Sequence, residues 1–538
     1  MVQSQKREQW YLITDRAERG FEFMRVGCIY SIENYCSIDK PMRSPMEIPF
    51  GISIIATVLK VASHDVDLFV ISPVTPLRKI LENYIREKKP QLFCLTAVSS
   101  QFPAIERAAA LIKELDPDIF VVLGGHHSSL APEQAIKCPN VDAICISEGD
   151  SAVVQLASQL KNGKWPTDIP NLWIRDAKTG EIEKNSTASF NEDLDTIPHV
   201  DRTLWEPWIA NPHEEASILV GRGCPYKCTY CSNHAMEELA EGKYVRYRSS
   251  EDMISEIDTL TKQYPRMNHI YLEIETVGAD ITKGIDLFEK LAFYNNARER
   301  KLAFRINLAL HSNFVRNEEK FRKFLELCQN AGVTALNVGL ESGSERVRRQ
   351  ILKRPRYTNK ELIGFCKTAR EYGVATSLLV LMGVPGETFD DYLETVRVVR
   401  ELQPEDVQLS IFYPYLGTDL YDVAVEQGVI TPGGVETSNE RHRATLELPD
   451  FPKWRVQLEF LYFWHRSFKG HWPIDRIFLK MFRAFLLRFT NLSAVARYLI
   501  VNNSLCNYIF KTYMDGAKKV TGIKEERLGL ASYHTGEL

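Results

Sequence analysis

Two blocks of the chain alternate short apolar runs with amphipathic stretches, and this alternation restricts the fold more than any other feature. Between the apolar runs of the first block, Ile52–Val61 and Phe102–Leu115 have apolar residues at spacings of three and four, which predicts helices. Continuous apolar strands separated by helices form a parallel sheet that is covered on both faces. The predicted strands of this block are Gln9–Thr14, Val66–Ile71, Gln91–Ala97, Asp118–Gly124 and Asp142–Ser147.

A second block of the same kind runs from about residue 215 to 430 and contains six strand–helix units. Six units predict an incomplete barrel, because a closed one needs eight. The predicted strands are Ser217–Gly221, His269–Glu275, Ala303–Ala309, Ala335–Glu341, Ala375–Met382 and Asp406–Tyr413.

The segments outside the two blocks have a different character. Residues 166–210 carry turn signals and read as a linker that contains a small hairpin around Leu172–Glu183. Residues 453–515 are aromatic, basic and helical in pattern. We expect them to pack on the barrel, and a substrate-recognition or membrane-surface domain is the alternative interpretation.

The fold class is therefore α/β, with four expected parts. A doubly wound domain spans 1–165, the linker spans 166–210, a partial barrel of six strand–helix units spans 211–435, and a helical domain spans 436–538. In both kinds of parallel sheet, ligands bind at the carboxyl ends of the strands.

Composition narrows the function classes. The net charge of the 538 residues is −4, so nothing favours a nucleic acid as partner. Apolar stretches such as Phe50–Val61 are too short to span a bilayer, and no window resembles a signal peptide. We expect a soluble, cytoplasmic protein.

Three of the eleven cysteines cluster, in the segment that directly follows the first barrel strand. Cys224, Cys228 and Cys231 lie within eight residues, whereas the other eight cysteines share no short spacing and read as buried apolar residues. Thiolates suit iron–sulfur clusters or zinc. A four-iron cluster normally takes four thiolates, so three would leave one iron open. A zinc site with His234 as fourth ligand is the alternative, although a loop above a barrel strand is an unusual place for a structural zinc.

The order of motifs resembles the radical S-adenosylmethionine (SAM) enzymes. The spacing Cys-x3-Cys-x2-Cys, with Tyr230 before the third cysteine, is similar to the signature of that family. Further motifs follow in the family's order: Arg246–Ser249, Gly339–Ser344, Gly383–Thr388 and Tyr413–Thr418.

This resemblance implies a [4Fe–4S] cluster on the three cysteines, with SAM bound at the open iron. One electron from the cluster would cleave SAM, and the resulting 5′-deoxyadenosyl radical would take a hydrogen atom from an unactivated carbon. Residues on alternate positions of a strand share a face, which makes several side chains candidates for the SAM site. They are Tyr230, Glu273, Glu275, Arg305, Asn307, Glu341, Ser342 and Gly383. Residues 274–277 depart from the family's extended second-strand motif, and no catalytic residue is assigned.

The first block resembles the cobalamin-binding domains of cobalamin-dependent radical SAM enzymes. It lacks a Gly-x-Gly-x-x-Gly dinucleotide motif and the Asp-x-His-x-x-Gly motif that supplies a lower axial histidine. The resemblance implies cobalamin bound without a histidine ligand, and a domain that keeps the fold without the cofactor is the alternative. The candidate contacts are Gly51, Ser99, Ser100, Gln101, Gly124, Gly125, His126, Glu148 and Gly149.

Together the two resemblances imply methylation of an unactivated carbon or phosphorus of a small molecule. Cobalamin would carry the methyl group, and a flavodoxin or ferredoxin would supply electrons. A radical cyclisation, ring rearrangement or other methyl-free reaction is the first alternative. A metal-binding protein without turnover is the second. Peripheral membrane contact through the C-terminal helices is a further expectation.

Overall fold

The computed structural model describes residues 23–33, 35–433 and 440–487. The chain forms two compact units. The N-terminal unit comprises residues up to 212 together with 235–249, and the barrel unit comprises 213–234 and the chain from 250 onward. The chain therefore passes from the second unit to the first at residue 235 and returns at 250. The predicted strand Gln9–Thr14 and the helical pattern beyond 487 lie outside the described residues.

The N-terminal unit contains a seven-stranded sheet in the order β2-β1-β3-β4-β5-β6-β7. The first five strands are parallel, and the hairpin β6–β7 adds to the edge in antiparallel fashion. The hairpin comes from residues 166–210, which the sequence predicts as a linker. The strands are β1 (Arg25–Ser31), β2 (Asp65–Ile71), β3 (Leu92–Thr96), β4 (Phe120–Gly124), β5 (Ala143–Cys145), β6 (Leu172–Arg175) and β7 (Ile182–Lys184), with the short β10 (Arg246–Tyr247) elsewhere in the unit.

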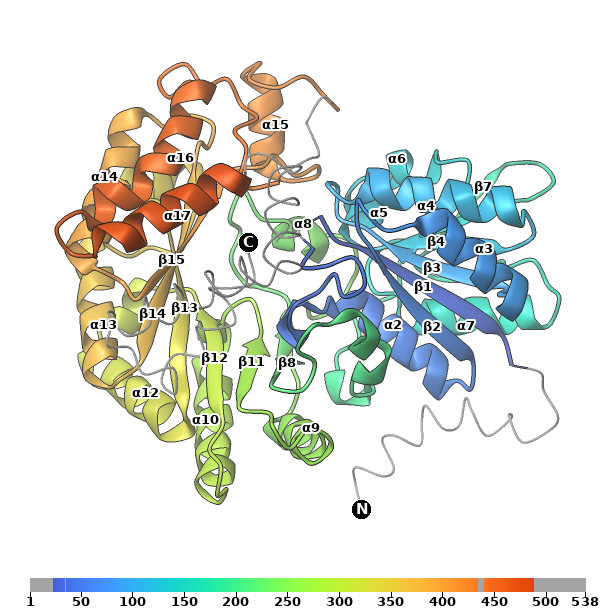
Figure 1. The fold of residues 1–538 in the computed structure, drawn as a ribbon, viewed down its shortest axis with the longest axis horizontal. Coiled ribbons are helices and arrows are strands. Elements are labelled where there is room, and N and C mark those ends of the chain that lie inside the picture. The colour runs from blue at the N-terminus through green and yellow to red at the C-terminus, as the bar shows by residue number, and fades with distance from the viewer. Residues whose placement is uncertain (1–22, 34, 434–439, 488–538) are drawn as a thin grey trace. The chain divides into compact units, whose positions relative to one another are not determined.

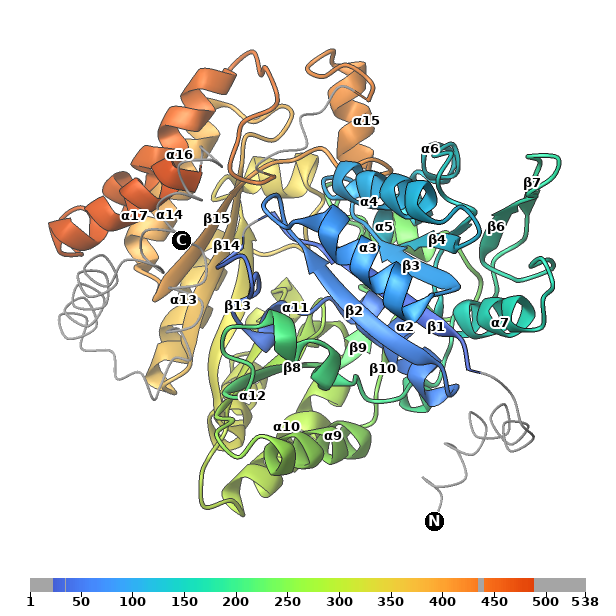
Figure 2. The ribbon, with the colours of Figure 1, turned by 45° about the vertical axis from the view of Figure 1, so that its right-hand side comes forward.

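Strand order 2-1-3-4-5 makes this a doubly wound fold that reverses direction between β1 and β3. Helices cover both faces of the sheet (Figures 1 and 2). They are α2 (Phe50–Val61), α3 (Leu77–Lys88), α4 (Phe102–Leu115), α5 (His126–Leu130), α6 (Pro132–Ile136) and α7 (Asp150–Lys161), with single turns at Pro45–Glu47, Leu194–Thr196, Arg202–Leu204 and Glu206–Trp208.

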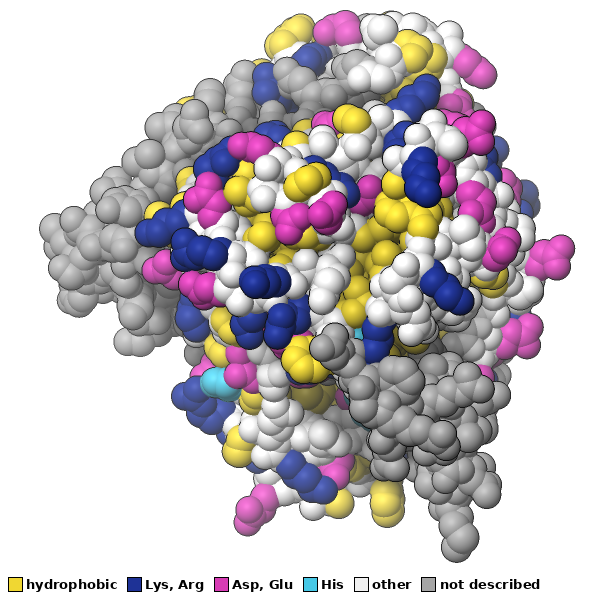
Figure 3. Space-filling model, turned by 90° about the vertical axis from the view of Figure 1, so that its right-hand side faces the viewer, with side chains coloured by type: hydrophobic (Ala, Val, Ile, Leu, Met, Phe, Trp, Pro, Cys, Tyr) yellow, Lys and Arg dark blue, Asp and Glu magenta, His cyan; other side chains and the backbone are white. Residues whose placement is uncertain are grey.

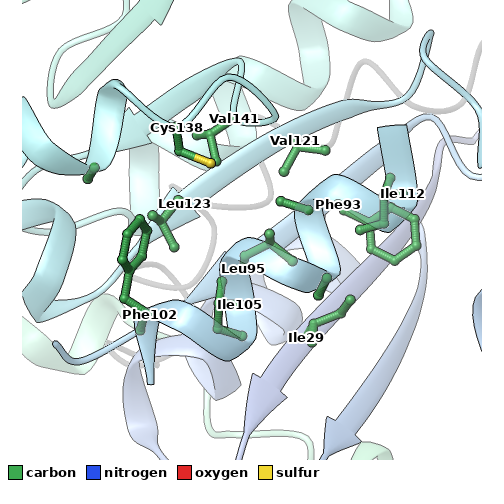
Figure 4. Close-up of a cluster of buried hydrophobic side chains, with 14 of the residues drawn as sticks. Ile29, Phe93, Leu95, Phe102, Ile105, Ile112, Val121, Leu123, Cys138 and Val141 are labelled. Atoms are coloured by element: carbon green, nitrogen blue, oxygen red, sulfur yellow. The ribbon is translucent and has the colours of Figure 1, made fainter. Parts of the chain in front are cut away.

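A dry core joins the sheet to α3 and α4. Leu95 of β3 lies near Ile105 of α4, the Phe93 ring of β3 lies beside Ile112 of α4, and Phe102 of α4 lies near Leu123 of β4 (Figure 4). These apolar positions alternate along each strand and recur at helical spacing along α4. The apolar face of the sheet and the apolar face of α4 therefore pack against each other.

The barrel unit contains six consecutive parallel strands in the order β15-β14-β13-β12-β11-β8. All six lie where the sequence predicts them, and the sheet remains open between β8 and β15. The strands are β8 (Glu215–Leu219), β11 (His269–Glu273), β12 (Ala303–Leu308), β13 (Val333–Glu341), β14 (Ala375–Met382) and β15 (Asp406–Ile411). The short strand β9 (Gly221–Arg222) follows β8 in the chain.

Helices lie on the outer face of this curved sheet (Figure 1). Two of them begin with a reciprocal cap, in which Thr358 pairs with Glu361 and Thr388 with Asp391. The helices are α9 (Ser250–Gln263), α10 (Ile281–Asn296), α11 (Ser312–Val315), α12 (Glu318–Ala331), α13 (Asn359–Glu371), α14 (Phe389–Leu402) and α15 (Asp419–Glu426), with turns at Val277–Asp280 and Val347–Ile351; α8 (Asn233–Glu237) lies where the chain leaves the unit.

The described part of the C-terminal region is helical, as its pattern predicts. Helix α16 (Lys453–Phe468) packs against α14 and β15, and α17 (Ile474–Leu487) packs against α16. The Tyr392 hydroxyl of α14 donates a hydrogen bond to the Glu459 carbonyl of α16 at 3.2 Å. These contacts make α16 part of the barrel unit.

The surface carries charges of both signs. On the face shown in Figure 3, acidic and basic side chains alternate around groups of hydrophobic ones. Among the described residues, no helix has both the length and the apolar character needed to cross a membrane.

Two glycines of the barrel unit give opposite expectations for the same substitution. A Cβ at Gly343 would lie 2.4 Å from the Thr395 Cα of α14, whereas a Cβ at Gly364, inside α13, would meet nothing within 4 Å. We expect G343A to lower the free energy of unfolding by about 1–3 kcal/mol. In contrast, G364A should raise it by up to about 1 kcal/mol, because alanine favours the helix. Urea unfolding followed by circular dichroism measures both, and a stabilised G343A would contradict the packing.

Candidate functional site

The three clustered cysteines lie on one loop at the carboxyl end of β8. This cluster loop, residues 222–234, begins with Gly223 at a φ of +88°, a conformation that glycine adopts without strain. The Cys231 amide donates to the Cys228 carbonyl at 3.0 Å, which closes a turn between two of the three cysteines. The loop therefore holds the thiols at the edge where barrel enzymes bind their ligands.

Contacts with two other segments of the barrel unit fix the cluster loop. The Thr229 amide donates to the Leu352 carbonyl at 3.2 Å, and its hydroxyl donates to the Ile351 carbonyl at 2.6 Å. The Leu420 amide of α15 donates to the Thr229 carbonyl at 2.9 Å. Because Thr229 lies between Cys228 and Tyr230, these bonds hold the middle of the loop.

The thiols are poor acids in this environment. Burial raises the pKa of the Cys224 thiol to about 12 and also raises the pKa of Cys228 and Cys231. Three buried thiolates need a positive charge close by, which iron supplies when a cluster binds. The donor set of three soft sulfur ligands thus fits an iron–sulfur cluster with one open iron.

The zinc alternative requires His234 to join the three sulfurs around one ion. In the structure, His234 Nε2 lies 2.9 Å from an Asp419 carboxylate oxygen of α15. His234 Nε2 is thus already engaged with a carboxylate, so a zinc-binding role would fall to its other ring nitrogen, Nδ1.

A polar ladder crosses three strands of the barrel. The Arg305 Nε donates to the Asn337 side-chain oxygen at 2.9 Å, and the Asn337 amide donates to Asn307 at 2.9 Å. Tyr271 also donates to Asn307, at 2.8 Å. The structure therefore brings the predicted Arg305 and Asn307 into one network and adds Asn337 and Tyr271 to it.

Two predicted carboxylates stand at the end of β11. Burial, with a further contribution from the nearby Glu275, raises the pKa of Glu273 to about 7. Glu275 follows the strand and is exposed in the ligand-free chain. A carboxylate next to the cluster loop is suited to the ammonium group of an amino acid, and that cation would lower the pKa of Glu273 again.

Glu341 ends β13 in a strained conformation. Its φ is +57°, at a point where the register between β13 and β14 shifts. Its carboxylate lies 3.6 Å from one terminal nitrogen of the Arg354 guanidinium, and the other terminal nitrogen donates a hydrogen bond to the Tyr230 hydroxyl at 3.2 Å. Backbone strain of this kind concentrates at functional sites, in keeping with a ligand role for Glu341.

Two other predicted SAM contacts are engaged in packing. Ser342 is fully buried, and its hydroxyl accepts a hydrogen bond from the Ser344 amide and lies 3.4 Å from the Thr395 hydroxyl. Gly383 has a φ of +76°, and its amide donates to the Glu387 carboxylate at 2.5 Å. Gly383 thus belongs to the tight turn before α14, and the structure gives both residues a structural role.

In the N-terminal unit, predicted cobalamin contacts gather where the sheet reverses direction. Gln101, after β3, donates to the Ser31 carbonyl at the end of β1 at 2.7 Å. Gly125, after β4, has a φ of +95°, and a Cβ there would lie 2.7 Å from the Ala97 carbonyl. The edge between β1 and β4 is therefore built from backbone held close together, which suits a large planar ligand.

The remaining candidates lie on the same side of the sheet with differing surroundings. Gly51 and His126 are exposed, and a Cβ on Gly51 would meet nothing within 4 Å. Ser99 lies 3.5 Å from His127, which stacks on Phe102. The other three follow the strands β3, β4 and β5: Ser100, Gly124 and Gly149.

Glu148 has a partner that the sequence does not reveal. Arg246, which is 3% exposed, binds both carboxylate oxygens of Glu148 at 2.9 and 3.1 Å. The same guanidinium donates to the Asn191 carbonyl at 2.8 Å and lies over the Phe190 ring. This pair anchors residues 235–249 in the N-terminal unit, so Glu148 carries a structural charge besides the ligand role predicted for it.

Sequence reasoning missed several charged or polar residues near the site. No motif in the sequence assigns a role to the stretch that contains Arg354 and Tyr357. Asn337 lies inside a predicted strand, and the predicted site residues of that strand lie at its carboxyl end. A signal existed only for Asn337, which interrupts an otherwise apolar strand. Arg246 was noted as part of a motif, but its partner lies 98 residues away.

Replacement of any of the three clustered cysteines should abolish cluster binding. We expect C224A, C228A and C231A to lose most of the iron and sulfide that the parent protein takes up in anaerobic reconstitution, because each removes one of the ligands. Cys36, in the N-terminal unit, offers a matched control, and C36A should bind iron as the parent does. Equal iron content in C224A and C36A would remove the loop from consideration as the cluster site.

Loss of the buried ion pair should destabilise the N-terminal unit. R246M leaves the Glu148 carboxylate without its guanidinium, which costs about 3–5 kcal/mol for a buried pair. Because Glu148 is 18% exposed on its side chain, we expect the lower end of that range. The double variant R246M/E148Q should lose less stability than the sum of the single variants, in urea unfolding followed by circular dichroism. Additive losses would mean that the two residues do not interact.

Comparisons with known proteins agree with this division of the chain. Residues 218–399 match the family model of the radical SAM superfamily, and residues 45–157 match that of the B12 binding domain. The chain is 25% identical, over 402 residues, to the uncharacterized methyltransferase PH0819 of Pyrococcus horikoshii, covering 74% of this chain and 82% of that protein.

Two further similarities involve a curated enzyme and a solved structure. The chain is 26% identical over 384 residues to the anaerobic magnesium-protoporphyrin IX monomethyl ester cyclase of Rubrivivax gelatinosus, covering 69% of this chain and 65% of that protein. The cobalamin-dependent S-adenosylmethionine radical enzyme OxsB with aqua-cobalamin bound has the same fold, with a TM-score of 0.63 and 15% identity over 92% of this chain and 75% of that one.

The B12 binding match lies within the N-terminal unit, from before α2 into α7. The radical SAM match runs from the end of β8 through the cluster loop into α14, so it lies in the barrel unit except for residues 235–249. The two matches identify a [4Fe–4S] cluster, SAM and cobalamin as the cofactors. The chain therefore belongs to the cobalamin-dependent radical SAM enzymes.

Proposed function

We propose that this enzyme transfers a methyl group from SAM, by way of cobalamin, to an unactivated carbon or phosphorus of a small-molecule substrate. The observation that carries the proposal is the cluster loop at the carboxyl end of β8, in a chain whose other unit is a B12 binding domain. The bound cluster supplies the electron that cleaves SAM, and cobalamin supplies the methyl group.

The residues of the barrel unit then have separable tasks. Cys224, Cys228 and Cys231 hold the cluster and leave one iron open for the amino and carboxylate groups of SAM. Glu273 and Glu275 offer negative charge to the ammonium group, and Glu341 offers hydrogen-bond acceptors at the end of β13. The ladder of Arg305, Asn307 and Asn337 keeps polar groups in a fixed arrangement on the strands that carry the proposed SAM contacts.

The residues of the N-terminal unit provide a site for the corrin. The backbone around Gly125 and the side chains of Ser99, Ser100 and Gln101 form the edge at which the cofactor binds. Gly51, Gly124, His126, Glu148 and Gly149 complete the proposed contacts. The Glu148 carboxylate keeps its pairing with Arg246, so its contribution to cobalamin comes through the backbone of residues 148 and 149.

Similarity to PH0819, named a methyltransferase, supports the methyl transfer. A methyl-free radical cyclisation is the second candidate, because the cyclase of Rubrivivax gelatinosus aligns with 69% of the chain. The two differ in the fate of SAM. Methyl transfer by way of cobalamin consumes one SAM as S-adenosylhomocysteine and one as 5′-deoxyadenosine, whereas a cyclisation releases no S-adenosylhomocysteine.

We further propose a cytoplasmic location and a flavodoxin or ferredoxin as electron donor. An iron–sulfur cluster with an open iron requires protection from oxygen and reduction by one electron at a time. Flavodoxins and ferredoxins supply single electrons. A peripheral membrane contact through α16 and α17 is compatible with the exposed aromatic side chains of Trp454, Phe478 and Phe482.

A label experiment tests the methyl transfer without a known substrate. The anaerobically reconstituted protein is mixed with reduced cobalamin and SAM that carries a deuterated methyl group. We expect S-adenosylhomocysteine and the deuterated methyl group on the corrinoid, both by mass spectrometry. Free cobalamin with SAM, without protein, is the control.

The same reaction, run with flavodoxin and its reductase, is examined for 5′-deoxyadenosine. Formation of 5′-deoxyadenosine with no S-adenosylhomocysteine and no label on the corrinoid would refute methyl transfer and favour the cyclisation. The C228A variant should form no 5′-deoxyadenosine, since it lacks a cluster ligand.

A further inference from the structure

A buried guanidinium lies against the cluster loop from within the barrel unit. The Arg354 side chain is 9% exposed, and its Nη1 lies 3.8 Å from the Cys228 sulfur and 3.2 Å from the Tyr230 hydroxyl. Its Nη2 donates to the Gly339 carbonyl at 3.1 Å and lies 3.6 Å from the Glu341 carboxylate. One side chain therefore touches a cluster ligand with one nitrogen and the end of β13 with the other.

The surroundings hold this guanidinium in a fitted slot. A Cβ on Gly339 would lie 2.2 Å from Arg354 Nη2, so only glycine leaves room for it. The Tyr357 hydroxyl donates to the same Gly339 carbonyl at 2.6 Å, and Arg348 lies over the Tyr357 ring at 4.7 Å. Both neighbours are buried, which restricts the guanidinium to one position.

We propose that Arg354 is a positioning residue that raises the reduction potential of the cluster through Cys228 and links that ligand to the SAM-binding end of β13. The inference rests on the cluster assigned to this loop and goes beyond the proposed methyl transfer. It assigns a role to a residue outside the cysteine motif, contributed by the segment between β13 and α13.

The physical reason lies in the charge that reduction adds. A reduced cluster carries one more negative charge than an oxidised one, and a guanidinium remains positive at any pH that a protein withstands. At a buried position the attraction is weakly screened, so it stabilises the reduced cluster more than the oxidised one. Hydrogen bonds to the sulfur atoms and net local charge are known to set the potentials of such clusters.

The donors around the loop differ in charge. The Cys231 sulfur accepts a hydrogen bond from the neutral side-chain amide of Asn233 at 3.5 Å, whereas the Cys228 sulfur accepts one from the charged guanidinium of Arg354. A role of Arg354 limited to neutralising Glu341 would leave the potential of the cluster unchanged when R354Q is made in an E341Q background. The potential measured in both backgrounds therefore separates the proposed role from one that acts only through Glu341.

The test measures the cluster potential by redox titration followed by electron paramagnetic resonance, on the reconstituted full chain without SAM, cobalamin or substrate. For R354Q we expect the equilibrium between oxidised and reduced cluster to shift at least tenfold toward the oxidised form. That shift corresponds to a potential lower by about 59 mV for one electron. R356Q is the matched control, since Arg356 is exposed and lies two residues away, and its potential should equal that of the parent.

An R354Q protein with a full iron content and the parental potential would overturn the proposal, as would an equal shift in R356Q. If R354Q fails to retain iron, R354M replaces it. Methionine removes the charge but keeps an unbranched side chain, so a potential below that of the parent supports the proposal and an unchanged potential overturns it. Because the titration involves no methyl donor or acceptor, its result is independent of whether the enzyme is a methylase.

Discussion

The placement of one buried and two partly buried thiols on one loop is the constraint on which the barrel unit depends. Ordinary thiols at these positions are held in the protonated form, since burial raises the pKa of Cys224 to about 12. Ligation requires thiolates, and thiolates in such a place require positive charge. Iron supplies most of it, and Arg354 is the protein's own cation beside Cys228. Much of the unusual backbone nearby follows from placing that cation, including the glycine at 339 and the strained Glu341.

Both units use the geometry of parallel strands in the same way. Neighbouring parallel strands end at the same edge of the sheet, so the geometry of the sheet alone brings loops from distant parts of the sequence together there. In the N-terminal unit, Gln101 ties the loop after β3 to the end of β1. In the barrel unit, Thr229 ties the cluster loop to the segment that carries Arg354. Both proposed cofactor sites therefore lie at the carboxyl edge of a parallel sheet, although the residues that line them differ in chemistry.

The sequence was sufficient for the barrel strands and for the cluster loop, because both are local patterns. All six barrel strands were predicted to within a few residues, and the three cysteines stand within eight positions of one another. Strand β1 was missed because Gly27 and polar neighbours weaken its pattern, although Gly27 is needed where a Cβ would lie 2.3 Å from the Phe93 ring. Contacts over long separations left no local trace: Arg354 lies 126 residues from Cys228.

Residue type alone does not decide between two roles that compete for one side chain. Ser342 was predicted to contact SAM because it follows Glu341 at a strand end, but the chain turns there and buries its hydroxyl against Thr395 of α14. Glu148 was predicted from its place after β5, yet its carboxylate pairs with Arg246. A pattern indicates which residues stand at an edge, and only packing decides which way each side chain faces.

Residues 235–249 have a consequence for how this protein can be divided. The segment belongs to the N-terminal unit, but the chain reaches it only after forming β8 and the cluster loop. A single cut near residue 212 would leave the first fragment without Arg246 and the Glu148 carboxylate without its partner. The two units are thus interleaved along the gene, and a segment exchange between relatives would have to carry this short stretch with the N-terminal unit.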